Sequence, residues 1–568
     1  MSRFNKALVT LAVFVALGTL STAYGLAIMG PTVGQDTFFT YFNLTPMDEA
    51  GYGRTARVLS KLNGANFGGA VIGAGYSAWS AERFGRKITI QAGCLLTIIG
   101  GALSSGAQTM TMLIVARAIT GVGAGVLAAV VPMYQSELAP VKIRGAMVCI
   151  TGVTYAFGYL LAGWTGYACS FIPPSSSHGS AAWRFPLALQ CLPPVIVLLG
   201  SNIILESPRW LLRQDKSDEA KRVVVHVNAS KHDASDDTSE QSAASQEFEM
   251  MEEQYEAEKR STSHRRFEII RTPGNIRRLF ITTTLFLGNQ FLGIYVLSNY
   301  SVIIYRRLGL TNHDPLLLNA CWTILCVIGN CVNAAIIDKV GRRPLLLIGC
   351  TGCTLCLIGE ATLTALFGGE DNQSALIGLV FFIWLYPCFW SPCMDATQFA
   401  YVSEIWPDPL RAQGVSLGLV VFFLFSGTTL VVAPIAQETI EWRFYLVLIC
   451  VSTAYDLIIY IWFPETKGKS QEEIAALFDR KPREPMANSA ASLGKATERE
   501  RRIGSDSSLN SSEACAESKG YELTTISHDG ESSNHEDNDK LARILKGALR
   551  AIRNLRWENR QAQQLSAV

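Results

Sequence analysis

The sequence has too little charge for a soluble protein of its length. Only 17% of its 568 residues are Asp, Glu, Lys or Arg, whereas 49% are hydrophobic, and the mean hydropathy is +0.21. A soluble chain of this size needs more charge to cover its surface. The formal net charge of +1 also argues against a nucleic-acid partner.

Side chains that carry enzyme chemistry are sparse. The seven His residues include no pair at metal-ligand spacing, and no catalytic Ser/His/Asp cluster stands out. Most of the 14 cysteines lie inside apolar runs and are interpreted as small hydrophobic residues. Gly121-x-Gly-x-Gly125 resembles a nucleotide loop, but inside an apolar run such glycines indicate close helix packing. We expect no enzyme, no cofactor and no metal site.

The chain instead contains apolar runs of about 18–25 residues, each long enough to cross a ~30 Å hydrocarbon core as a helix. This pattern predicts an all-α polytopic membrane protein with twelve transmembrane helices in two six-helix bundles. The first six spans are expected at 7–29, 64–81, 88–107, 111–134, 145–168 and 185–205. The second six are expected at 279–303, 316–337, 344–367, 375–402, 412–436 and 443–463.

Polar segments divide the chain into four parts. The bundles occupy 1–205 and 279–463, and a charged loop with short helices is expected at 206–278. The remainder, 464–568, is rich in Ser, Glu and Asp and is predicted to be a largely disordered tail. Basic residues in the short loops favour cytosolic termini and a cytosolic central loop. The sequons at Asn43 and Asn372 then lie outside as candidate glycosylation sites.

The two bundles repeat each other's motifs. Glu82-Arg-Phe-Gly-Arg-Lys87 recurs as Asp338-Lys-Val-Gly-Arg-Arg343, and two further pairs begin at Ser136 and Ser403 and at Glu206 and Glu465. The acidic residues of these pairs are separated by 256, 267 and 259 residues. Three ordered matches at nearly one offset indicate two homologous bundles.

The repeated loops combine acids and bases at helix ends. We expect them to form a cytosolic gating network that pairs across the junction between bundles; alternatively, the basic groups only enforce topology. The candidate residues are Glu82, Arg83, Arg86, Glu137, Arg144, Glu206, Arg209, Asp338, Arg342, Arg343, Glu404, Arg411 and Glu465.

These motifs resemble those of the sugar porters of the major facilitator superfamily, and of the fungal branch in particular. The two loops resemble the superfamily's Asp-Arg-x-Gly-Arg-Arg signature, Val131–Glu137 resembles Pro-x-Tyr-x-x-Glu, and Leu205–Leu211 resembles Pro-Glu-Ser-Pro-Arg-Trp-Leu. Phe463–Gly468 is similar to the family's last-helix terminator. The resemblance spans about residues 10 to 475. It implies alternating access, with a binding site between the halves.

The seventh span holds the polar residues that the resemblance places at the solute. At 100° per residue, Asn289, Gln290, Gly293, Asn299 and Tyr300 fall on about half of a helix circumference. Amides and a phenol suit neutral hydroxyl groups because they both donate and accept hydrogen bonds; interhelical hydrogen bonding is the other reading. The candidates on this span are Asn289, Gln290, Gly293, Tyr295, Asn299 and Tyr300.

Several positions depart from the family pattern. Gly152 stands where helix five usually has Gln, and the family's stacking Trp in helix ten is lost or replaced by Phe399. Gly25 stands where proton symporters of the family have an acid, which favours facilitated diffusion. Asp395 lies near the expected pocket and is both a solute candidate and a candidate proton carrier, since burial favours a neutral carboxyl group.

Two other acids, Glu360 and Asp456, also lie within apolar spans. We expect them to be paired with hydrogen-bond donors or with a buried base, for which Arg117 is the candidate.

The sequence therefore predicts a monomeric transporter whose partners are membrane lipid and a small-molecule solute, a sugar or polyol. It is expected to work as a uniporter or weak proton symporter at the plasma membrane. Two alternatives stay open. The unusual pocket would suit another small molecule, such as a secondary metabolite. The long tail, with its basic segment from Leu541 to Trp557, would suit a nutrient sensor that does not transport.

Overall fold

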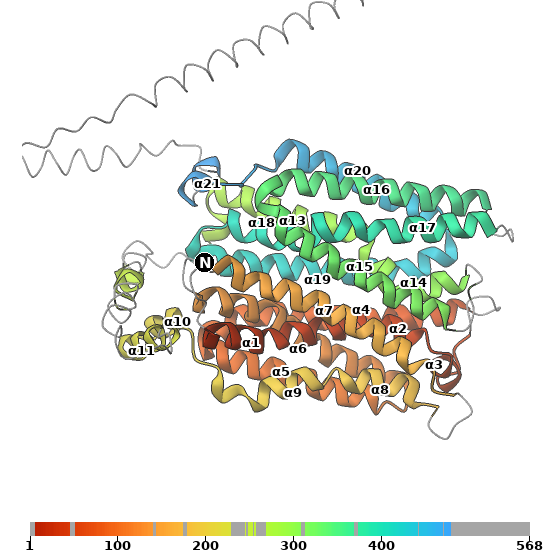
Figure 1. Ribbon diagram of the computed structural model, residues 1–568, viewed down its shortest axis with the longest axis horizontal. Coiled ribbons are helices and arrows are strands. Elements are labelled where there is room, and N and C mark those ends of the chain that lie inside the picture. Colours follow the sequence, from red (N-terminus) through yellow and green to blue (C-terminus); the bar gives the residue numbers. More distant parts are fainter. Residues whose placement is uncertain are drawn as a thin grey trace, which may run out of the picture. The chain divides into compact units, whose positions relative to one another are not determined.

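The computed structural model describes most of the chain up to residue 478. The described ranges are 6–45, 52–139, 144–173, 179–228, 245, 248–253, 255–256, 268–307, 310, 313–367, 373–440, 442–469 and 471–478. Every regular element in these ranges is a helix (Figure 1). Asn372, the side chain of Arg144 and most of the predicted tail lie outside the described residues.

The first six predicted spans all correspond to helices. In order, they are α1 (Lys6–Ala27) with α2 (Met29–Val33), α4 (Tyr52–Phe84), α5 (Arg86–Ser105), α6 (Met110–Leu138), α7 (Arg144–Cys169), and α8 (Ala181–Leu189) with α9 (Leu192–Leu199). A short helix, α3 (Asp36–Tyr41), follows the first span. α4 begins earlier than the predicted residue 64, because the helix continues through a more polar turn that includes Arg54, Arg57 and Lys61.

The second six spans are also present, and three short helices flank them. The spans are α13 (Pro273–Phe291) with α14 (Ile294–Arg307), α15 (Asp314–Val340), α16 (Arg342–Phe367), α17 (Gln373–Trp390) with η3 (Ser391–Asp395) and α18 (Ala396–Ile405), α19 (Asp408–Thr439), and α20 (Arg443–Trp462). The flanking helices are α10 (Pro208–Arg213) and α11 (Ser217–Asn228) before them and α21 (Gln471–Phe478) after them. Single 3-10 turns are η1 (Ser201–Ile203) and η2 (Glu268–Ile270). This confirms the predicted all-α, twelve-span fold.

Local sequence explains where several helices begin and break. Thr272 caps α13 by accepting a hydrogen bond from the Asn275 N–H at 3.2 Å, and Pro273 fits the first helical position. The tenth span changes to a π-helical turn over Ser391–Asp395, which contains Pro392. Such turns occur where a helix absorbs an irregular hydrogen-bond pattern, and they are frequent at functional sites.

Ten of the twelve spans are long and apolar enough to cross a membrane over the described residues. The other two, α4 and α7, are long enough, at 33 and 26 residues, but more polar. These two helices form the main contacts between the halves, α4 with α19 and α7 with α15. A helix that faces protein along the interface needs less apolar surface than one that faces lipid. In Figure 1 the first half is drawn from red to orange and the second from green to blue.

Glycine allows α4 and α6 to approach closely. A Cβ added at Gly121 would lie 1.9 Å from the backbone oxygen of Asn66, and one at Gly125 would lie 2.1 Å from that of Ala70. The interpretation of Gly121-x-Gly-x-Gly125 as a packing motif is confirmed.

The bundle has two distinct ends. We call the end that holds residues 82–87 and 338–343 the motif end, and the end that holds α3 the far end (Figure 1).

Candidate functional site

A break in the seventh span places the predicted solute residues on two helices. Gly293 has a φ of +90°, which favours glycine, and it separates α13 from α14. Asn289 and Gln290 lie in the last turns of α13. The remaining candidates on this span lie in α14: Tyr295, Asn299 and Tyr300. The expectation of one continuous helix face is therefore wrong.

Asn289 and Gln290 form hydrogen bonds within the second half. Asn289 Nδ2 donates to Gln398 Oε1 at 2.7 Å, and Asn289 Oδ1 accepts from the Tyr455 hydroxyl at 2.9 Å. The Ser426 hydroxyl donates to Gln290 Oε1 at 2.8 Å. In this conformation the two amides join helices, which is one of the two roles that the sequence left open.

Tyr300 lies at the interface between the halves. Its hydroxyl accepts from Asn63 Nδ2 of α4 at 2.7 Å and donates to the Leu430 backbone oxygen at 3.0 Å. Asn299 is buried where α14 meets α2, because a Cβ added at Gly30 would lie 3.0 Å from the Asn299 backbone oxygen. The hydrogen bond between Asn63 and Tyr300 therefore joins the two halves.

Asp395 lies on η3 in the tenth span, which contacts α15 of the second half. Its Oδ2 accepts a hydrogen bond from Asn330 Nδ2 at 2.8 Å. In the first half, the rings of Tyr155 and Tyr159 on α7 lie 5.7 Å apart between centroids.

Phe399 is partly buried one helical turn beyond Asp395. Its ring packs at 5.5 Å from that of Phe286 and at 5.9 Å from that of Phe422, measured between centroids. Phe399 thus contributes to an aromatic cluster of the second half.

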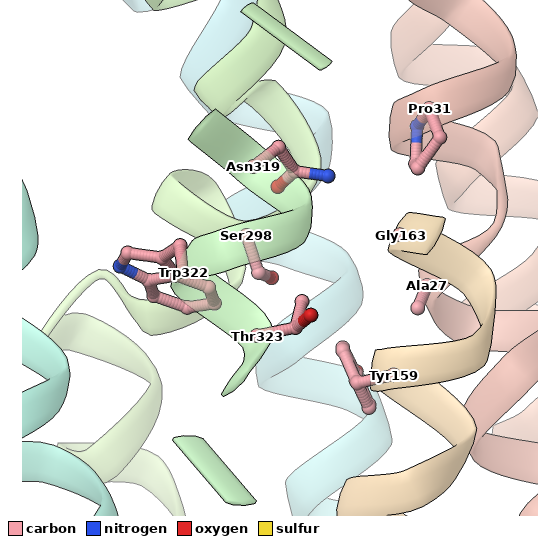
Figure 2. A pocket seen from close by; sticks show the side chains of 8 residues that line it. All are labelled: Ala27, Pro31, Tyr159, Gly163, Ser298, Asn319, Trp322 and Thr323. Carbon is pink, nitrogen blue, oxygen red and sulfur yellow. The ribbon is translucent and has the colours of Figure 1, made fainter. Parts of the chain in front are cut away.

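A small cavity lies between the halves (Figure 2). Its lining from the first half is Ala27, Pro31, Tyr159 and Gly163, and from the second half Ser298, Asn319, Trp322 and Thr323. Figure 2 shows the Tyr159 and Thr323 side chains directed toward the same space from opposite halves. The cavity has room for about one water molecule, so a solute enters only when the halves move apart.

The sequence prediction missed most of the residues on this interface. Among them are Tyr155 and Tyr159 on α7, Asn63 on α4, and the α15 residues Asn319 and Asn330. The spacing of Gly152, Tyr159, Gly163 and Gly166 at intervals of seven, four and three residues was the available signal, because it marks one face of α7.

At the motif end of the first half, a buried ion pair organises the repeated loop. Arg86 Nη2 lies 2.7 Å from Glu137 Oε1, and the side chains are 2% and 11% exposed. Glu206 Oε1 accepts from the Arg86 backbone N–H at 2.7 Å. The Ser207 hydroxyl donates to Glu137, and the Tyr134 hydroxyl donates to the Leu205 backbone oxygen at 2.8 Å.

The second half has the same ion pair and the same kinds of hydrogen bond at the corresponding residues. Arg342 Nη2 lies 2.7 Å from Glu404 Oε1, with exposures of 13% and 23%, and Asp338 adds a second pair with Arg342 at 2.9 Å. Glu465 accepts from the Arg342 backbone N–H at 3.1 Å, and the Thr466 hydroxyl donates to Glu404 at 2.6 Å. The Arg343 N–H also donates to Glu465, at 3.0 Å.

These ion pairs differ from the prediction in their partners. Among the described residues, each pair at the motif end lies within one half, and none crosses the junction. Glu82 pairs loosely with Arg213 at 3.7 Å, whereas Arg83 is exposed and Arg209 and Arg411 are partly buried. Pairing across the junction therefore stays a prediction, and the Arg144 side chain lies outside the described residues.

The far end, in contrast, carries polar contacts between the halves. Arg306 Nη1 lies 2.6 Å from Asp36 Oδ1, and Arg306 Nη2 donates to the Gly34 backbone oxygen at 2.6 Å. His313 Nδ1 lies 2.9 Å from the Ser170 hydroxyl. Asn43, the described sequon, is exposed at this end with a φ of +50°.

The charged groups within the spans pair only in part as predicted, because Asp456 has a hydrogen-bond donor and Glu360 has none among the described residues. Arg117 is fully buried, and its Nη2 donates to the Gly25 backbone oxygen at 3.0 Å rather than to any acid among the described residues. Asp456 accepts from the Thr351 hydroxyl at 2.7 Å. Both carboxylate oxygens of Glu360 lack a partner among the described residues, so the expectation that Glu360 is paired is wrong.

The chain is similar to known transporters over most of its length. The family model described as "Sugar (and other) transporter" matches residues 11–478. The MFS-type transporter criB of Aspergillus cristatus is 30% identical over 459 residues, which cover 80% of this chain and 90% of that protein. A high-affinity glucose transporter of Kluyveromyces lactis is 29% identical over 479 residues, covering 81% and 83% of the two chains.

Solved structures share the fold. The proton:xylose symporter XylE, bound to 6-bromo-6-deoxy-D-glucose, superposes with a TM-score of 0.69 at 22% identity, covering 84% of this chain and 100% of that one. A partially occluded, inward-open form of XylE from E. coli gives a TM-score of 0.66 at 19% identity, covering 81% and 100%.

Proposed function

This chain belongs to the sugar (and other) transporter family and is a multi-pass membrane transporter rather than an enzyme, and we propose that it carries a monosaccharide-sized polar solute through the interface between its halves. The observation that carries the proposal is the set of hydroxyl and amide groups contributed to one cavity by both halves. These groups are Tyr159, Ser298, Asn319 and Thr323. Each donates and accepts hydrogen bonds, as a polyhydroxylated solute requires.

The distribution of contacts supports alternating access. The far end is held by contacts between the halves, including Arg306 with Asp36 and Tyr300 with Asn63. At the motif end the described ion pairs lie within each half, so the halves separate there without breaking one of these pairs. We assign this conformation to the branch of the cycle that is closed at the far end. Opening that end breaks the Arg306 and Tyr300 contacts.

We further propose that the motif end and both termini face the cytosol and that the far end, with Asn43, faces outward at the plasma membrane. The basic residues of the two repeated loops support this orientation through the positive-inside rule. The central loop and the tail would then be cytosolic, and the transporter would act as a monomer.

The residues inside the bundle are compatible with transport as a uniporter or as a weak proton symporter. Gly25 offers no carboxyl group beside Arg117, which favours uniport. Asp395 on η3, hydrogen-bonded to the Asn330 amide, is the candidate proton carrier.

The test is uptake of labelled hexoses, a pentose and a polyol by transporter-deficient cells that express the chain, with and without a protonophore. We expect saturable uptake of at least one solute. Thr323→Trp, which fills the cavity, is the matched control and should abolish uptake at unchanged surface expression. Uptake of no solute in the panel would contradict the proposal, and insensitivity to the protonophore would establish uniport.

A further inference from the structure

Two side chains one helical turn apart on α15 offer complementary hydrogen-bonding groups to the cavity between the halves. Asn319 Oδ1 accepts a hydrogen bond from the Ser301 hydroxyl at 2.8 Å, so its Nδ2 group, which has no partner among the described residues, is left to donate. The Thr323 hydroxyl donates to the Ala320 backbone oxygen at 2.6 Å, so its lone pairs are left to accept. Figure 2 shows the Asn319 nitrogen and the Thr323 oxygen on the side of α15 that faces the first half.

The first half closes the cavity with a phenol and a glycine of α7. The Tyr159 hydroxyl is buried and has no hydrogen-bond partner among the described residues. A Cβ added at Gly163 would lie 3.4 Å from Thr323 Oγ1, so a single methyl group would fill the gap between α7 and this hydroxyl. The cavity therefore has a donor and an acceptor on one wall and an unsatisfied phenol on the other.

The size of the cavity matches one hydroxyl group, because it has room for about one water molecule. A hydroxyl group accepts a hydrogen bond from Asn319 and donates one to Thr323 at the same time. A carbonyl oxygen or a fluorine cannot donate, an ammonium group cannot accept, and a methylene group does neither. Each of these replacements leaves a buried group of the protein unpaired, which costs affinity. The two side chains of α15 therefore select a hydroxyl group.

We propose that this cavity is the subsite for one particular hydroxyl group of the solute, which accepts from Asn319, donates to Thr323 and meets the Tyr159 hydroxyl when the far end is closed. The inference rests on the proposed function and identifies residues that decide which sugar or polyol is carried. Because both halves line the subsite, filling it also stabilises the conformation that is closed at the far end.

The experiment combines solute analogues with variants of Thr323. Uptake of the best transported labelled sugar into transporter-deficient cells is inhibited with the series of its monodeoxy and monodeoxyfluoro analogues. We expect one position at which both replacements weaken inhibition by about 5- to 100-fold, the loss expected for unpaired buried groups. In Thr323→Val, the hydroxyl group and fluorine at this position should inhibit within about threefold of each other, because the acceptor is gone. Thr323→Ser, which keeps the acceptor, should keep the fluorine penalty.

Two further variants separate recognition from folding. Thr362→Val removes a hydroxyl group on the exposed face of α16 that likewise donates to a backbone oxygen, and it should leave the inhibition profile unchanged. Gly163→Ala keeps every hydroxyl and amide group but narrows the subsite. It should therefore weaken inhibition by the parent sugar more than by the smaller deoxy analogue at the selected position, and this result does not depend on the expression of Thr323→Val.

The outcomes separate this inference from the proposed function. Equal fluorine penalties in the wild type and in Thr323→Val would overturn the inference alone, as would the absence of any position at which both replacements weaken inhibition. Uptake of no solute by the wild-type chain would instead refute the proposed function.

Discussion

The two halves are alike at the motif end and unlike in the middle of the membrane. In both halves, an Arg at the motif end forms an ion pair with a Glu, and a second Glu accepts a hydrogen bond from the backbone N–H of that Arg. A hydroxyl group donates a hydrogen bond to the first Glu. In the middle, the first half holds a buried cation, Arg117, and the second holds a buried acid, Glu360, and a partly buried one, Asp395. The repeated parts hold each half rigid, while the parts that differ create an asymmetric interface for a solute.

The largest loss of stability is expected when the Arg of a repeated ion pair is replaced, and the loss should be greater for the more buried pair. Arg86→Gln leaves Glu137, which is 11% exposed, without its cation, at a cost of about 3–5 kcal/mol. Arg342→Gln leaves Glu404, which is 23% exposed and still bonded to Thr466, at a cost of about 1–3 kcal/mol. Unfolding of the detergent-purified variants measures both, with the exposed Arg83→Gln as the control. Equal losses in the two halves would remove the distinction based on burial.

The loop glycines test whether the repeat extends to the backbone. Gly85 and Gly341 have φ values of +94° and +107°, and an added Cβ would lie 2.6 Å and 2.9 Å from the carboxylates of Glu206 and Glu465. We expect Gly85→Ala and Gly341→Ala to cost about 1–3 kcal/mol each, with similar effects on the apparent Tm. Gly68→Ala is the control, because its Cβ would meet open space. A tolerated Gly341→Ala beside a damaging Gly85→Ala would limit the backbone requirement to one half.

The sequence predicted the parts of the molecule that depend on local pattern. Span positions, the duplicated loops and the glycine packing of α6 follow from hydropathy and spacing, and they agree with the fold. The hydrogen-bond partners of individual side chains were not predictable in the same way. Asn289 was predicted to face the solute, yet it is bonded to Gln398 and Tyr455, because the rotation of each helix is set by packing against its neighbours.

The interface residues illustrate the same limit. Tyr155 and Tyr159 were not predicted because a tyrosine on an apolar helix is ordinary in sequence, and only the packing of α7 against α15 places Tyr159 at the cavity. The π-helical turn that carries Asp395 likewise depends on tertiary packing.

A smaller change in stability is expected when the acid of the second half that lacks a partner among the described residues is replaced. Glu360 makes no hydrogen bond through either carboxylate oxygen among the described residues, so Glu360→Gln removes no observed interaction. We expect the unfolding free energy to change by less than about 1 kcal/mol. Arg117→Gln, in contrast, removes the hydrogen bond to the Gly25 backbone oxygen and should destabilise by about 1–3 kcal/mol. A large loss in Glu360→Gln would show that this carboxyl group has a partner in the membrane-embedded protein.

The smallest effect on stability, but an informative one for transport, is expected at the far end. Asp36 is 75% exposed and Arg306 is 33% exposed, so Asp36→Asn should change the unfolding free energy by only about 0–1 kcal/mol. Because this pair joins the halves, its loss should still favour conformations open at the far end. Labelling of a cysteine introduced at Ser298 by a membrane-impermeant maleimide, added from the far-end side, should become faster. Asp338→Asn, which removes an exposed pair within one half, is the matched control and should leave the labelling rate unchanged. Faster labelling in both variants, or in neither, would mean that the far-end pair does not hold the halves together.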